Sequence, residues 1–102
     1  MLKSTLVVAS LLASISVSAQ AMSGNVLYDQ MKRGSRAQAM AYVEAVADVF
    51  YGNKFCPPEG TTVGQIYDLV EKNLRDYPQY RQLEAWSLIL VSLEKYYPCS
   101  TK

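Results

Sequence analysis

The chain has 102 residues, with ten lysines and arginines against nine aspartates and glutamates, two cysteines and no histidine. This near-neutral balance lacks the basic stripe that is typical of nucleic-acid-binding proteins, and the short cluster at 32–36 is interpreted as a solvated connector between helices. Without histidine, Ser–His and Cys–His nucleophiles are excluded, and no glycine-rich phosphate loop is present. We therefore expect neither an enzyme nor a cofactor or metal.

Residues 1–21 have the layout of a secretory signal peptide, with a basic start, an apolar run over 6–17 and small residues after it. Cleavage is expected after Ala19 or Ala21. The apolar run is shorter than the roughly 20 residues needed to span a bilayer, so a retained membrane anchor is the weaker alternative. The mature domain is then 22–102, about 80 residues exported to a compartment in which disulfides form.

Helical periodicity dominates the mature chain, and no segment alternates convincingly like a strand. The pattern predicts a short first helix over 23–31 with Ser23 as its N-cap. It predicts a second helix over 35–51 that Gly52 ends.

A third helix is expected to begin at Thr62, because Gln65 follows at the spacing of a capping box. Pro78 ends it. A fourth helix runs from about Leu83 and stops before Pro98. The expected fold is all-α, a small four-to-five-helix bundle with one disulfide.

Apolar residues recur along one side of each predicted helix, and these faces should form the core. The four faces comprise Val26, Leu27 and Met31; Ala39, Val43, Val46 and Phe50; Val63, Ile66, Tyr67, Val70, Leu74 and Tyr77; and Leu83, Trp86, Leu90, Leu93 and Tyr97.

Cys56 and Cys99 are expected to form a disulfide. If the third and fourth helices make an antiparallel hairpin, Cys56 precedes the start of one and Cys99 follows the end of the other. Closing a loop of about 43 residues should stabilise the domain by roughly 4 kcal/mol in the chain-entropy model. A reactive thiol or a metal ligand is the weaker interpretation, because no histidine or second cysteine pair exists to complete a zinc site.

Tyrosine is in excess, with eight residues against two phenylalanines and one tryptophan. Tyrosine combines a large apolar body with a polar tip and is enriched at recognition surfaces. Helical phase places Tyr67, Tyr77 and Tyr97 toward the core. Tyr80, in the turn between the last two helices, is the least explained by packing.

Four segments together resemble the Rap/Tai immunity proteins of type VI secretion systems. They are SGNVLYDQM, AYVEAVADV, FCPPEGTTVGQIYDLVEKNL and YPQYRQLEAWSLILVSLEKYYPC. The resemblance implies a small, helical, periplasmic and often dimeric protein that binds a toxin delivered by sibling cells. For the Tai branch, it implies inhibition of a peptidoglycan amidase effector by blocking of its active-site cleft.

One departure from the resembled pattern concerns a second cysteine pair, which many such proteins carry at the positions of Met31 and Ala39. Its absence predicts a first helix that is held less rigidly to the second. It is also what a divergent or orphan member with a different partner would show.

The expected effector-binding residues are Tyr77, Tyr80, Arg81 and Gln82, in the turn before the last helix. Tyrosine and arginine are over-represented among binding hot spots, so Tyr80→Ala or Arg81→Ala should weaken inhibition with little change in folding. The alternative is an ordinary solvated turn, which would move the contact to the loop over 51–60.

A homodimer is expected through Leu88 and Val91, an apolar pair on the far side of the fourth helix. The alternative is that the first helix covers this pair in a monomer.

Two other functions remain open at this level. One is a small periplasmic helical stress chaperone with a single disulfide, which acid-triggered exposure of apolar surface would favour. The other is a structural envelope subunit without an enzyme target. After signal cleavage, we expect no contact with nucleic acid or membrane.

Overall fold

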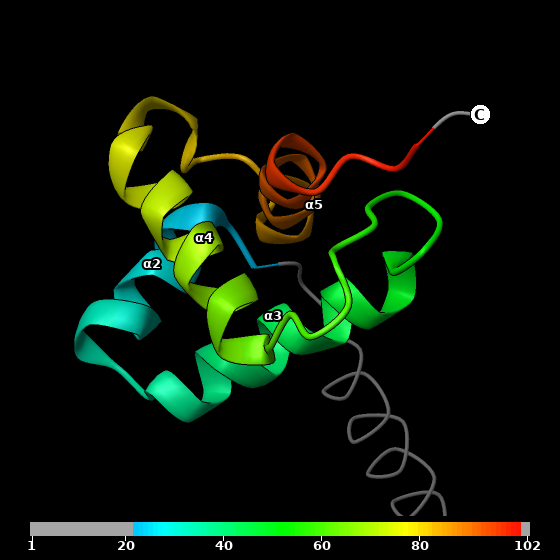
Figure 1. Cartoon of the computed structure of the whole chain (residues 1–102). Coiled ribbons are helices and arrows are strands. Elements are labelled where there is room, and N and C mark those ends of the chain that lie inside the picture. Colours follow the sequence, from blue (N-terminus) through cyan, green and yellow to red (C-terminus); the bar gives the residue numbers. More distant parts are fainter. Residues whose placement is uncertain (1–21, 101–102) are drawn as a thin grey trace, which may run out of the picture.

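The computed structural model describes residues 22–100, which form four α-helices and one short 3₁₀ helix. The elements are α2 (Gly24–Arg33), α3 (Arg36–Phe50), α4 (Val63–Asp76), η2 (Pro78–Tyr80) and α5 (Ala85–Tyr96). In Figure 1, α4 and α5 lie beside each other, and α3 runs beneath both. The all-α class and the small bundle are confirmed. The expected signal peptide lies outside the described residues.

Serine and threonine side chains begin three of these helices. The Ser23 hydroxyl accepts a hydrogen bond from the Val26 amide at 3.2 Å, and Ser35 begins α3 in the same way. At α4, the Thr62 hydroxyl accepts from the Gln65 amide at 3.1 Å, and the Gln65 side-chain oxygen accepts from the Thr62 amide at 2.9 Å. The predicted capping box is therefore confirmed, and it satisfies two backbone donors that the helix leaves unpaired.

We predict that Thr62→Ala destabilises the protein by about 1 kcal/mol, because the Gln65 amide loses its acceptor. Urea unfolding of the variant and the wild type measures the loss. Thr62→Ser keeps an oxygen at the same position and is the matched control, so it should lose much less. Equal losses in the two variants would assign the effect to the methyl group and not to the cap.

A single apolar cluster fills the space between the helices and includes Leu27 and Met31 of α2 and Ala39, Val43 and Ala47 of α3. Four of the six residues of the predicted α4 face are buried, namely Ile66, Tyr67, Val70 and Leu74. Phe55, from the loop between α3 and α4, is fully buried in the same cluster. Phe55 therefore anchors this otherwise largely exposed loop to the core.

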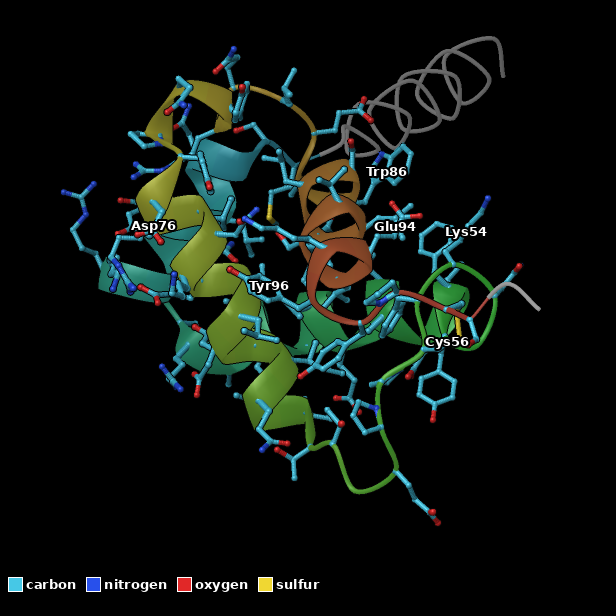
Figure 2. The ribbon with its side chains drawn as sticks, turned by 45° about the horizontal axis from the view of Figure 1, so that its top comes forward. Lys54, Cys56, Asp76, Trp86, Glu94 and Tyr96 are labelled. Carbon is cyan, nitrogen blue, oxygen red and sulfur yellow. A yellow bond between two sulfur atoms is a disulfide. The ribbon has the colours of Figure 1, made fainter. Side chains whose placement is uncertain are left out.

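The predicted apolar face of α5 is wrong at its start, although Leu93 is buried as predicted. Leu83 and Trp86 are 46% and 41% exposed, and Figure 2 shows Trp86 on the outside of the bundle. The buried residues of α5 are Ala85, Leu88, Ile89, Ser92 and Leu93. The Ala85 amide donates to the Met22 carbonyl at 2.8 Å, which holds the start of α5 with Ala85 turned inward.

Two further residues of the predicted core are exposed. Tyr77, 38% exposed, follows the last residue of α4 with a backbone that has left the helix (φ −126°, ψ 65°), so the helical phase no longer sets its direction. Val26 is 49% exposed, because Leu27 and Met31, four residues apart, take the inward side of α2. Tyr67 is buried, as predicted.

The expected disulfide between Cys56 and Cys99 is present, with the two Cα atoms 4.8 Å apart and a sequence separation of 43. Figure 2 shows it where the loop after α3 meets the segment after α5. The Cys56 amide also donates to the Tyr97 carbonyl at 2.8 Å, so the two segments are joined by backbone as well as by sulfur. The chain turns at Gly52 after α3. The φ angle of Gly52 is +76°, a value that favours glycine.

Met31 and Ala39, the positions of the second cysteine pair in the resembled proteins, are both buried in the apolar cluster. Apolar packing therefore occupies these two positions of α2 and α3. Within residues 22–100, no helix has both the length and the apolar character needed to cross a membrane.

Candidate functional site

An apolar groove of about 320 Å³ lies between the end of α4, the connection that contains η2, and α5. Its lining includes Tyr77, Tyr80, Leu83, Leu88, Val91 and Lys95. Because most of these side chains are apolar or aromatic, the groove is suited to an apolar group of another molecule.

Two tyrosines form one edge of the groove. The Tyr77 and Tyr80 rings lie 6.3 Å apart between centroids and are tilted by 35°. Tyr80 is 51% exposed, and the Lys95 ammonium lies 5.2 Å from the Tyr77 ring centroid. This edge therefore presents aromatic surface beside a positive charge, a combination that is common at protein interfaces.

The four predicted effector-binding residues do not all line the same surface. Tyr77 and Tyr80 line the groove, whereas the neighbouring Arg81 faces α2, and Gln82 is exposed without lining the groove. The sequence order of the turn therefore places these side chains on different sides of the connection.

The two predicted dimer residues, Leu88 and Val91, differ in how exposed they are. Leu88 is 8% exposed, and a Cβ atom built on Gly24 would come within 2.5 Å of its Cδ1 atom, so the start of α2 lies directly on Leu88. Val91 is 55% exposed. The first helix thus covers Leu88 and leaves Val91 open, in the same groove as Tyr80.

Arg81 is held by three contacts within the protein. Its Nε–H group donates to the Leu74 carbonyl at 2.7 Å, and its guanidinium carbon lies 4.0 Å from the Tyr28 ring centroid. Its own carbonyl accepts from the Asn25 amide at 2.7 Å. Substitution of Arg81 therefore disturbs folding contacts as well as any binding role, unlike the expectation from sequence. Tyr28 and Asn25 were not among the predicted site residues.

A charged cluster joins α2 to α4 on another part of the surface. The Lys32 ammonium lies 2.5 Å from one Glu71 oxygen, and the Arg75 guanidinium donates to the other oxygen at 2.8 Å. Burial alone would raise the Glu71 pKa, but the hydrogen bond from Lys32 and the charges of Lys32 and Arg75 outweigh it and lower that pKa below its usual value of 4.5.

This lowered pKa predicts a pH dependence of stability. The contribution of Glu71 is fully present above pH 4.5 and is lost as the pH falls through the lower pKa of the folded state. Urea unfolding from pH 7 down to acid pH should therefore show a loss in the wild type that is smaller in Glu71→Gln. Identical slopes in the two proteins below pH 4.5 would contradict a stabilising role for this carboxylate.

The described residues do not gather groups that hold a metal ion. Within residues 22–100, no three or more His, Cys, Asp or Glu side chains are placed to do so. Glu44 and Asp48 are four apart on α3, and both are exposed.

The sequence profile of the family described as Rap1a immunity proteins matches residues 11–99. The chain therefore belongs to the Rap1a immunity protein family, which confirms the resemblance found from its motifs. The matched region includes the groove and both cysteines. No match is found among curated proteins.

Proposed function

We propose that this member is a periplasmic immunity protein that binds a peptidoglycan amidase delivered by a type VI secretion system. It inhibits the amidase by covering the active-site cleft, acting as a binding protein without catalysis or a cofactor. Membership of an immunity protein family supports the class of function. The aromatic groove supports the mode of binding.

The observation that carries the proposal is the ordered presentation of Tyr80 at the edge of the groove. Its amide donates to the Tyr77 carbonyl at 3.1 Å, and its carbonyl accepts from the Leu83 amide at 3.0 Å. A half-exposed aromatic side chain on an ordered turn loses little conformational entropy when a partner covers it. Tyrosines in such positions are frequent hot spots.

We predict that Tyr80→Ala weakens binding of the amidase by about 2 kcal/mol, the cost expected at a hot spot. Calorimetric titration against purified type VI amidase effectors, beginning with any encoded beside this gene, measures the loss. Val49→Ala is the control, because Val49 is 71% exposed on α3 and lies outside both the groove and the loop over 51–60. Equal affinities of the Tyr80→Ala variant and the wild type would place the contact elsewhere, with the loop over 51–60 as the next candidate.

The periplasm is the proposed compartment because of the signal-peptide pattern in residues 1–21 and the disulfide in the folded domain. N-terminal sequencing of the protein purified from a periplasmic fraction tests this. The mature chain should begin at Gln20 or at Met22. A full-length chain in the membrane fraction would instead indicate a retained anchor.

A homodimer is also proposed, with Val91 in the contact between the two copies. Because Val91 and Tyr80 line one groove, a second copy and the effector would compete for it. Addition of effector should therefore separate the two copies and leave one effector molecule bound to each.

If no amidase binds and the protein instead captures unfolded proteins at acid pH, the chaperone alternative is favoured.

A further inference from the structure

A second hollow, of about 820 Å³, lies between α2 and the connection that precedes α5. Its lining includes Asn25, Val26, Tyr28, Lys32, Arg33 and Arg81. Tyr80 and Arg81 are neighbours in sequence, yet Tyr80 lines the groove and Arg81 lines this hollow. The connection therefore separates two adjoining concave surfaces.

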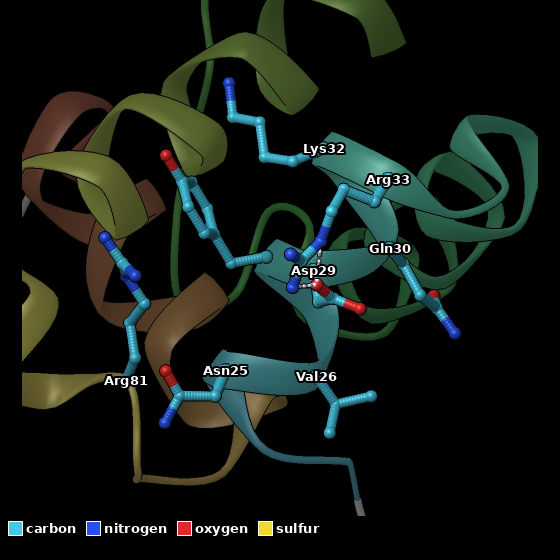
Figure 3. Close-up of a pocket in the computed structure, with 8 residues that line it drawn as sticks. Asn25, Val26, Asp29, Gln30, Lys32, Arg33 and Arg81 are labelled. Carbon is cyan, nitrogen blue, oxygen red and sulfur yellow. Dashed lines mark hydrogen bonds and ion pairs between the residues drawn. The ribbon is translucent and has the colours of Figure 1, made fainter.

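The positive charges of the hollow differ in whether they are already paired. Lys32 pairs with Glu71, and the Arg33 Nε–H group donates to Asp29 at 2.7 Å. Figure 3 shows Arg33 reaching across to Asp29, while Arg81 lies beside Asn25. Within residues 22–100, no carboxylate forms an ion pair with Arg81. Of the positively charged residues that line the hollow, Arg81 is therefore the one without a counter-ion among residues 22–100.

The Arg81 guanidinium is oriented before any partner arrives. Its Nε–H group donates a hydrogen bond to the Leu74 carbonyl, and its guanidinium carbon lies over the Tyr28 ring. No other residue of 22–100 accepts a hydrogen bond from its two terminal amino groups. A guanidinium fixed in this way can bind both oxygens of a carboxylate with little further loss of side-chain entropy.

We propose that Arg81 is a carboxylate-binding site, and that the protein partner of this chain presents an aspartate or glutamate to it. Asn25, Val26 and Tyr28 line the same hollow, so they would contact the partner residues on either side of the acidic side chain. The inference rests on the proposed function, because the acidic residue belongs to the effector. It extends the binding surface from the groove across the connection to α2.

The test uses two peptides that differ only in charge at one position. They are acetyl-Leu-Glu-Leu-amide and acetyl-Leu-Gln-Leu-amide, titrated into the ¹⁵N-labelled mature protein at low ionic strength. The glutamate peptide should shift the Arg81 Nε–H, Asn25 and Tyr28 signals saturably and bind about tenfold more tightly, equivalent to roughly 1.4 kcal/mol. Added salt should weaken it. Equal binding of the two peptides, or shifts confined to other residues, overturns the proposal.

Two variants separate a specific site from general positive charge. Arg81→Lys keeps the charge and loses the planar fork, so it should lose most of the discrimination between the peptides. Arg33→Gln removes a charge from the same hollow and should keep that discrimination, so an equal loss in Arg33→Gln would contradict the proposal. The peptide comparison in the wild-type protein stands even if Arg81→Lys fails to fold. It also needs no effector, so it can fail while amidase inhibition holds, or hold while amidase inhibition fails.

Discussion

Replacing either cysteine by serine should lower the free energy of unfolding by about 4 kcal/mol, because the unfolded chain then gains the freedom that a 43-residue ring denies it. Stabilities of small domains are of the order of 5–15 kcal/mol, so this is a large share of the total. Urea unfolding of Cys56→Ser and Cys99→Ser measures the loss. Each variant should match the reduced wild-type protein.

The double variant decides whether the two sulfurs act as one bond. If they do, Cys56→Ser combined with Cys99→Ser is no less stable than either single variant. Additive losses would mean that each side chain contributes through its own packing. Titration of thiols in the unfolded, unreduced mature protein is an independent check, since two reactive thiols per chain would contradict the disulfide in the purified protein.

Leu88→Glu should destabilise the protein by about 3 kcal/mol or more, because it places a carboxylate without a partner under the first turn of α2. Val91→Glu lies one turn further along α5, and its side chain is 55% exposed, so it should change stability little. Urea unfolding of the two variants provides a matched comparison on one helix. Similar losses in both would mean that Val91 is buried in the protein in solution.

The same pair of variants tests the proposed homodimer. If the groove is the dimer contact, Val91→Glu should sediment as a folded monomer at micromolar concentration while the wild type sediments as a dimer. A wild-type monomer under these conditions would refute the dimer. In that case the groove is free for the effector alone.

The parts of the fold that follow from local chemistry were predictable from sequence. The capping box at Thr62 and Gln65 depends on residues three apart, and the end of α4 depends on Pro78. The disulfide was predictable because only two cysteines exist and the two helices between them return the chain to its start. In each case, the determining residues are few and their geometry is restricted.

The inward face of α5 was not predictable in the same way. Its apolar residues occur almost all round the helix, so periodicity does not distinguish the core side from the groove side. The choice is made by residues far away in sequence. The Met22 carbonyl holds Ala85, and Gly24 allows α2 to lie against Leu88.

The candidate site likewise has a part that could be predicted from sequence and a part that could not. Tyr77 and Tyr80 were found from residue type and position in a turn, and both line the groove. The contacts of Arg81 with Tyr28 and Leu74 depend on how α2 packs against the connection, which no local pattern of the sequence encodes.

The ring closed by the disulfide contains α4, η2 and α5 and leaves α2 and α3 outside it. We therefore expect amide hydrogens of α2 to exchange with solvent through detachment of that helix alone, and those of α4 and α5 to exchange only through wider unfolding. Tyr28 lies on this separable helix, and Tyr80 lies within the ring. A partner that contacts both would hold α2 against the ring and slow the exchange of its amide hydrogens.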